Sequence, residues 1–164
     1  MIRPLLAGDA PAATAIYNHY VATTTATFQT EPLTTDAWLA EATAGEPGRH
    51  GAWAVTDDAA GGVVGYVLVS PFKGRCAYRD TAEVTVYLDA AAHGRGLGRA
   101  ALAFAEEHAR AVGLHALLAV VCAENDASLR AFGRHGYEEV GRLREVGTKF
   151  GRLLDVVYLE RLLP

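Results

Sequence analysis

A strand, a glycine-rich turn and an amphipathic helix follow one another in residues 86–113, VYLDAAAHGRGLGRAALAFAEEHARAVG. This order predicts a helix that packs back on a sheet, and hence an α/β domain. The turn lacks β-carbons just before the helix, where several backbone N–H groups have no intrahelical acceptor and the helix dipole is positive. A phosphate group can approach such a backbone closely, and the residues concerned are Gly94, Arg95, Gly96, Gly98 and Arg99. The glycines alone also leave open a turn that only reverses the chain.

The remaining elements are expected from the spacing of apolar residues and from the residues that cap helices. Helices are expected at 9–21, 34–44, 99–113 and 125–136, and their candidate N-caps include Asp9, Thr34 or Thr35, and Asn125 or Asp126. Strands are expected at 2–6, 52–56, 63–70, 82–88, 116–122 and 154–163, with the turn DDAAGG at 57–62 between the second and the third. The pattern predicts an α/β (α+β) domain around a mixed sheet of six or seven strands.

Length and charge exclude several classes of protein. The 164 residues suit one domain, 1–164, with a core of its own. The 15 Lys and Arg against 19 Asp and Glu leave a net charge of −4, which gives no basic field for a nucleic acid or an anionic membrane surface. The N-terminus lacks the pattern of a secretory signal, and no segment approaches the roughly 20 apolar residues that span a bilayer. We therefore expect a cytoplasmic protein that binds neither nucleic acid nor membrane.

The spacing of cysteines and histidines gives no sign of a metal site. Cys76 and Cys122 form no CxxC pair, and the six histidines form no HxH or HExxH arrangement. We therefore expect two reduced thiols and an activity without a bound metal.

Two other phosphate-binding patterns fit the turn less well. A P-loop has Lys-Ser or Lys-Thr after its last glycine, and this sequence has neither. GLGRAA, residues 96–101, satisfies the G-x-G-x-x-A pattern of dinucleotide-binding domains, with Glu124 after the next strand. In that fold the first glycine directly follows the strand, whereas DAAAH separates Leu88 from Gly94 here. Dinucleotide binding is therefore the second interpretation.

Two motifs resemble those of the GNAT acetyltransferase superfamily. The turn is similar to its acyl-CoA signature, Q/R-x-x-G-x-G/A, with His93 in the first position and Gly96 and Gly98 as the glycines. NDASLRAFGRHGY, residues 125–137, is similar to the second coenzyme-contacting motif, a helix that opens with Asn and closes with Gly and an aromatic residue. The resemblance implies the GNAT fold, a single domain whose mixed, mostly antiparallel sheet is flanked by about four helices.

Further segments resemble the phosphinothricin acetyltransferase family over residues 2–162. They are IYNHYV, TATFQTEP, PFKGRCAYRDTAEVTVYL and ENDASLRAFGRHGYEEVGRLREVGTKFGRLLDVVYLE. Members of this family acetylate the α-amino group of phosphinothricin, methionine sulfone or methionine sulfoximine. The resemblance implies an acetyl-CoA-dependent N-acetyltransferase that acts on a small amino-acid-like amine and forms a homodimer with the active site near the interface.

Acetyl transfer to an amine needs a group that accepts a proton, because an aliphatic amine near neutral pH is mostly ammonium. Glu83, in TAEVTVYL, is the only acid in an otherwise apolar strand, and the family's proposed general base matches it. Burial would raise its pKa toward the useful range. A glutamate at a sheet edge or in an ion pair is the alternative.

The resemblance also implies which residues contact acetyl-CoA. In the superfamily, the strand that carries Val86, Tyr87 and Leu88 separates from its neighbour, so that its backbone N–H groups face the thioester and pantetheine and stabilise the developing oxyanion. Asn125 and Ser128 would contact the pantetheine arm, although Asn125 is equally explained as a helix cap. The pyrophosphate would lie over the turn, beside His93, Gly94, Arg95, Gly96, Leu97, Gly98 and Arg99.

Two positions depart from the family pattern. Many superfamily members have a tyrosine, and phosphinothricin enzymes often a histidine, at the position of Phe132, which cannot protonate the leaving thiolate. In TKFG, Phe150 replaces a histidine considered part of the family's active site. The thiolate would then take its proton from water or from the zwitterionic intermediate.

An amino acid with an anionic or strongly polar side group needs cations and hydrogen-bond donors around it. FKGRCAYRD supplies them just before the apolar strand, and the residues expected to bind the substrate are Lys73, Arg75 and Tyr78, with Phe28 as a pocket wall. Each of these is equally compatible with a surface charge or a core aromatic residue.

Three functions are compatible with these residues. The first is a small-molecule amine acetyltransferase, and the second is an acyl-CoA-binding module without catalysis, suggested by Phe132 and Phe150. Protein N-terminal acetylation is the third, within the enzyme class.

Overall fold

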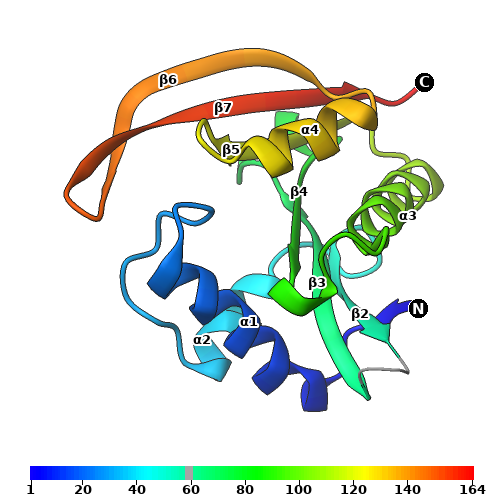
Figure 1. Cartoon of the computed structure of the whole chain (residues 1–164). Helices are drawn as coiled ribbons and strands as arrows, with labels where there is room; N and C mark the ends of the chain where they lie inside the picture. The colour runs from blue at the N-terminus through cyan, green and yellow to red at the C-terminus, as the bar shows by residue number, and fades with distance from the viewer. Residues whose placement is uncertain (58–60) are drawn as a thin grey trace.

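A computed structural model describes residues 1–57 and 61–164 of the chain. Within these residues, seven strands and four α-helices follow one another (Figure 1). The strands are β1 (Ile2–Pro4), β2 (Gly51–Asp57), β3 (Gly62–Pro71), β4 (Thr81–Leu88), β5 (Ala116–Cys122), β6 (Glu138–Lys149) and β7 (Arg152–Leu162). The helices are α1 (Ala10–Thr23), α2 (Thr35–Ala42), α3 (Leu97–Ala111) and α4 (Asp126–Arg134). The turn expected at 57–62 includes residues 58–60, which lie outside the described part of the chain.

All seven strands form one sheet in the order β1-β2-β3-β4-β5-β7-β6. Only β4 and β5 pair in parallel among the described strands, and every other neighbouring pair is antiparallel. The parallel pair is joined by α3, as a crossover connection requires. The predicted α/β domain with a mixed, mostly antiparallel sheet and about four helices is therefore confirmed.

Helices cover both faces of the sheet (Figure 1). On the face of α1 and α2, Trp38 packs edge-to-face on Tyr66 with 5.0 Å between the ring centroids. On the other face, α3 buries Leu102 and three alanines at helical spacing in one cluster with Phe132 of α4. None of the described helices is long and apolar enough to cross a membrane.

Two of the predicted helix caps are confirmed. The Thr34 hydroxyl accepts a hydrogen bond from the Ala37 backbone N–H at 3.2 Å, ahead of α2. The Asn125 side-chain oxygen accepts one from the Ser128 backbone N–H at 3.2 Å, ahead of α4. Each cap satisfies an N–H group that has no acceptor within its helix.

Asp9 occupies the N-cap position of α1 as predicted, but its carboxylate makes no capping hydrogen bond to that helix. It accepts hydrogen bonds from the Arg3 guanidinium at 2.6 and 2.9 Å and from the Leu6 backbone N–H at 2.8 Å. A 3-10 turn, Ala7–Asp9, runs directly into α1, so Asp9 has helical backbone angles instead of the extended ones of a cap. The hydrogen bond with Arg3 lowers the pKa of this carboxyl.

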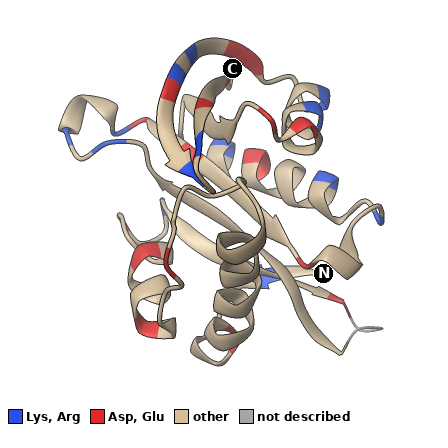
Figure 2. Ribbon diagram, turned by 60° about the vertical axis from the view of Figure 1, so that its left-hand side comes forward, with Lys and Arg blue, Asp and Glu red and all other residues tan. Residues whose placement is uncertain are grey.

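The residue pattern does not predict β6, which the structure adds at the edge of the sheet beyond β7. Its side chains are nearly all exposed, and both charge signs are interspersed along it (Figure 2). Its register with β7 shifts twice. A strand exposed on both faces needs no alternation of apolar and polar residues, so it carries no signal of period two.

Candidate active site

Strands β4 and β5 pair over only part of their length. Thr81–Glu83 pair with Ala116–Leu118, and no later residue of β4 pairs with β5 in the described sheet. The two strands separate from there on and border a cleft of about 1020 Å³. The glycine turn, α4 and the segment after α1 line the rest of this cleft. Figure 1 shows where these elements lie relative to β4 and β5.

Glu83 lies at the point where β4 and β5 separate. It pairs with Ser70 of β3 on one side and Leu118 of β5 on the other, so it belongs to a central strand. Its half-buried side chain lines the cleft, and within the described residues its carboxylate has no hydrogen-bond or ion-pair partner. Burial raises the pKa of this carboxyl. Neither an edge position nor an ion pair therefore explains this acid, and its carboxylate can accept a proton from a group in the cleft.

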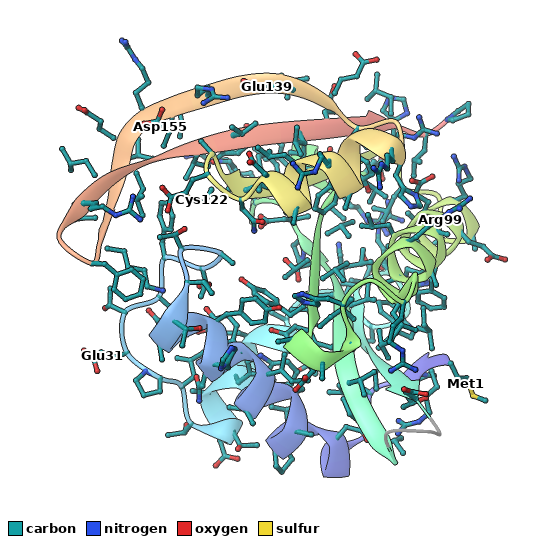
Figure 3. All side chains as sticks on the ribbon, in the orientation of Figure 1. Met1, Glu31, Arg99, Cys122, Glu139 and Asp155 are labelled. Carbon is teal, nitrogen blue, oxygen red and sulfur yellow. The ribbon has the colours of Figure 1, made fainter. Side chains whose placement is uncertain are left out.

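The glycine turn brings the N-terminus of α3 to the cleft. Gly94 and Gly96 have φ angles of +73° and +79°, in the left-handed region that favours glycine. A β-carbon at either position would meet nothing within 4 Å, so the turn backbone faces open space. Gly98 and Arg99 line the same cleft, and Arg99 lies on the first turn of α3 (Figure 3). The turn thus offers backbone N–H groups and a guanidinium to an anion.

Two other residues of the turn do not line the cleft. The Arg95 guanidinium forms an ion pair with Asp57, at the end of β2, with 2.6 Å between Nη1 and Oδ2. Leu97 packs against the core on the α3 side of the sheet. The predicted coenzyme contacts of Arg95 and Leu97 stay predictions, and they would have to come from the backbone.

His93 lines the cleft and is held by α1. The Tyr20 hydroxyl donates a hydrogen bond to the Leu88 carbonyl oxygen at 2.7 Å and lies 2.9 Å from Nε2 of His93. Because the hydroxyl has only one proton, the imidazole Nε2–H is the donor in the second bond. No local sequence pattern marks Tyr20, since its partners lie 68 and 73 residues away.

The three predicted coenzyme-contacting residues of β4 all line the cleft. Val86 and Leu88 also pack against the core on the α3 side. Tyr87 packs instead against Tyr17 and Tyr20, and its hydroxyl donates to the Ala26 carbonyl oxygen at 3.1 Å. With these side chains held elsewhere, β4 presents its backbone to the part of the cleft that β5 leaves open.

Helix α4 forms another wall. Asn125 and Ser128 line the cleft as expected, although the Asn125 oxygen is engaged as the helix cap. Phe132 also lines the cleft, and its ring packs edge-to-face on Tyr137 with 4.9 Å between centroids. The side chain at this position can therefore exclude water but cannot donate a proton.

The residues predicted to bind the substrate are only partly brought together. Phe28 lines the cleft, but Lys73, Arg75 and Tyr78 are exposed and do not line it. They belong to the connection between β3 and β4, which projects from the body of the molecule (Figure 2). Lys73 and Tyr78 contact the ring of Phe72 there, at 5.2 and 5.6 Å from its centroid. Their substrate contacts stay predictions.

The segment after α1 closes the cleft and is tied to the β6–β7 hairpin. The Thr25 hydroxyl donates to the Glu124 carboxylate at 2.8 Å, and Arg152 donates to the same carboxylate at 2.8 and 2.9 Å. The ammonium group of Lys149 donates to the Thr27 carbonyl oxygen at 2.8 Å. The sequence analysis does not single out Lys149, because Thr27 lies 122 residues away and no local pattern connects the two.

Phe150 lies at the tip of the hairpin and outside the cleft lining. Phe150 is 55% exposed, and its φ angle of +51° is rare for a residue with a side chain. The position at which the family has histidine therefore does not line the cleft within this chain.

Both cysteines are free thiols, as expected. Cys76 is exposed, whereas Cys122 is buried at the end of β5 and lines the cleft (Figure 3). The described residues contain no group of three or more His, Cys, Asp or Glu side chains arranged to hold a metal ion.

Comparisons with known proteins match this geometry. Residues 13–137 match the acetyltransferase (GNAT) family. The chain is 38% identical over 163 residues to the phosphinothricin N-acetyltransferase of Streptomyces coelicolor, covering 98% of this chain and 94% of that one. It is 37% identical to the L-methionine sulfoximine/L-methionine sulfone acetyltransferase of Pseudomonas paraeruginosa, covering 97% and 92%.

Solved structures agree in fold. A phosphinothricin acetyltransferase from Sinorhizobium meliloti in complex with acetyl-CoA superposes with a TM-score of 0.92 at 28% identity, over 99% of this chain and 88% of that one. A ribosomal-protein-alanine N-acetyltransferase from Brucella melitensis superposes with a TM-score of 0.91 at 34% identity, over 99% of each chain.

Proposed function

The chain belongs to the acetyltransferase (GNAT) family and is an N-acetyltransferase close to the phosphinothricin and methionine sulfoximine acetyltransferases. From that premise we propose that it transfers the acetyl group of acetyl-CoA directly to the α-amino group of a small amino-acid-like substrate. Phosphinothricin, methionine sulfone and methionine sulfoximine are the substrates that the names of its relatives suggest. The observation that carries the proposal is the cleft that joins an unpartnered Glu83 to the glycine turn of α3.

The cleft suits acetyl-CoA in shape and chemistry. Gly94 and Gly96 leave the space beside the turn free of β-carbons, and the α3 N-terminus supplies N–H donors for a pyrophosphate. Arg99 adds a guanidinium, while Asn125 and Ser128 line the path of a pantetheine arm. Acetyl-CoA supplies the acetyl group as a thioester. The backbone of Val86–Leu88, unpaired on the β5 side, would donate to the acetyl oxygen as negative charge develops on it.

Glu83 accepts the proton of the substrate ammonium, directly or through one water. A carboxyl whose pKa is raised by burial is a stronger base than an exposed one, so it matches the amine better. Its lack of a protein partner in the described structure leaves the carboxylate free for this role. Since neither Phe132 nor Phe150 has an acidic proton to donate, the leaving thiolate takes its proton from water or from the attacking nitrogen.

We also propose a homodimer. Six of the ten large apolar side chains exposed in the described structure lie on the β6–β7 hairpin, which is more than a monomer normally leaves uncovered in one place. Four of them lie between residues 143 and 153, on the part of the hairpin that includes its turn, namely Leu143, Val146, Phe150 and Leu153. Light scattering should therefore give the mass of two chains, and a Leu153→Glu variant should give the mass of one. A monomeric wild-type protein would contradict the proposal.

Thiol release from acetyl-CoA tests the proposed activity. The panel contains phosphinothricin, methionine sulfone, methionine sulfoximine and a peptide that begins with alanine. Release with at least one of the three amino acids supports the proposal. Release with the peptide alone would indicate protein N-terminal acetylation, the activity in the name of the Brucella structure. Acetyl-CoA binding without release from any amine would indicate a module that only binds the coenzyme.

A further inference from the structure

Phe28 touches the hairpin at a residue that has no side chain. A β-carbon built on Gly147 would lie 2.2, 2.3 and 3.1 Å from three ring carbons of Phe28, so the ring packs directly on the Gly147 backbone. Gly147 does not have a left-handed φ angle. Glycine is therefore needed at this position for space, and not for backbone conformation.

A second contact holds the neighbouring residue. Lys149 is only 3% exposed, and its ammonium group donates to the Thr27 carbonyl oxygen at 2.8 Å. Burial lowers the pKa of this lysine, so its charge is kept at an energetic cost that the hydrogen bond offsets. Gly147 and Lys149, two residues apart on β6, thus fix two consecutive residues of the segment after α1.

Phe28 lies on the side of the cleft that the substrate amine would occupy. Side chains alternate along a strand, so Glu83 shares a face of β4 with Tyr87. Tyr87 packs against α1, and its hydroxyl binds the carbonyl of Ala26. The segment that carries Phe28 is therefore on the face of the proposed base, whereas the glycine turn and α4 are on the face of α3.

We propose that Gly147 and Lys149 are positioning residues that hold Phe28 as a fixed wall of the amine site, and thereby set how long a substrate side chain the cleft admits. The inference rests on the proposed function, because it assigns this wall to the amine and not to the coenzyme. Any residue larger than glycine at position 147 pushes the ring off the hairpin and into the cleft.

The test compares Gly147→Ala with Gly141→Ala. Gly141 lies on the same strand, and a β-carbon there meets nothing within 4 Å, so this variant is the matched control. The substrates are methionine sulfone and S-methylcysteine sulfone, which is one methylene shorter. In Gly147→Ala we expect kcat/KM for the longer amine to fall by about fivefold or more relative to the shorter one, with the KM for acetyl-CoA unchanged. Gly141→Ala should keep the wild-type ratio.

A double-mutant cycle separates positioning from general destabilisation. With Phe28→Ala already present, adding Gly147→Ala should change the ratio by less than about twofold, because the ring that transmits the effect is gone. Lys149→Met, which keeps the stem but loses the donor, should raise the KM for the longer amine while leaving acetyl-CoA affinity intact. An unchanged ratio in Gly147→Ala, or an equal change in both backgrounds, would overturn the inference.

If the wild-type protein acetylates neither amine, that result counts against the proposed function alone. Crystal structures of the two alanine variants then still test whether Gly147 positions Phe28. In Gly147→Ala the ring of Phe28 should move by about 1 Å, because the 2.2 Å approach has to open to at least 3.0 Å. A ring that stays in place while the hairpin moves instead would overturn the inference.

Discussion

Replacement of Glu83 by glutamine tests the chemistry without disturbing the fold. The carboxylate has no partner among the described residues, so Glu83→Gln breaks no hydrogen bond or ion pair of the protein. Glutamine keeps the shape but cannot accept the proton of an ammonium. Loss of a general base typically costs 100- to 10,000-fold, so turnover should fall by that factor, equivalent to about 2.7–5.5 kcal/mol of activation free energy. Acetyl-CoA affinity should stay unchanged, because the proposed coenzyme site lies over the turn and α4.

The same substitution has a predictable effect on stability. Burial raises the pKa of Glu83 in the folded state, so the folded protein holds this proton more tightly than the unfolded chain does. The resulting contribution to stability is fully present below the ordinary pKa of glutamate, about 4.3, and is lost as the pH rises through the folded value. At neutral pH the ionised side chain is therefore a cost that glutamine removes. Glu83→Gln should melt at or above the wild-type temperature at pH 7.

The decisive measurement is thiol release as a function of pH. The acidic limb of the wild-type profile should lie above the ordinary pKa of glutamate, and it should move or vanish in the variant, since it reports Glu83, the amine, or both. Calorimetric titration with acetyl-CoA and a thermal melt serve as controls. A variant that folds and binds acetyl-CoA normally but retains nearly full turnover, with an unshifted profile, would refute the assignment of Glu83 as the base.

Three further changes test other parts of the molecule. Gly96→Val should abolish acetyl-CoA binding in calorimetric titration. The branched side chain of valine would fill the space proposed for the phosphate, and the φ angle of +79° at this position disfavours valine. An unchanged affinity would contradict the proposal that the pyrophosphate binds at this turn. Gly65→Ala should lower the melting temperature by about 3–10 °C, since its β-carbon would come within 2.5 Å of the Tyr87 carbonyl oxygen, and an unaltered melt would contradict that packing. Asp9→Asn should cost about 1–3 kcal/mol in urea unfolding at pH 7. Because Arg3 lowers the pKa of Asp9, this loss should be complete above the ordinary pKa of aspartate and disappear as the pH falls through the lowered value; a loss independent of pH would exclude the ion pair as its cause.

Those parts of the fold that bury one or both faces in the core were predictable from the sequence. Helix α3 shows buried residues at helical spacing, and β5 is an unbroken apolar run, so the pattern of each strand or helix records its own burial. The glycine turn and the single acid of β4 were also predictable, because each stands out against its immediate neighbours in the sequence. Resemblance to a family then connected these two local signals to one reaction.

Features that depend on distant contacts were not predictable in this way. Lys149 looks like one more charge on a polar strand until its hydrogen bond to Thr27 is seen, and Tyr20 looks like part of a helix face. Lys73 and Arg75 illustrate a second limit of sequence reasoning. Their charge and their nearness to Glu83 in sequence suggest a binding site, but sequence distance does not tell where a connection lies, and within this chain both side chains are exposed and outside the cleft lining, so their role stays a prediction.

The last strand of the chain is not the last strand of the sheet. β7 lies between β5 and β6, so the edge of β5 has no neighbour until residues 152–162 have been synthesised. The same hairpin holds the segment after α1 over the cleft, directly through Lys149 and indirectly through Arg152, whose partner Glu124 accepts from Thr25. A growing chain on the ribosome can form the glycine turn and α3 early, because their contacts are local, but pairings between such distant residues form late. A premature stop codon or a protease that removes the C-terminal strand would therefore uncover the edge of β5 and release the segment after α1 from its place over the cleft.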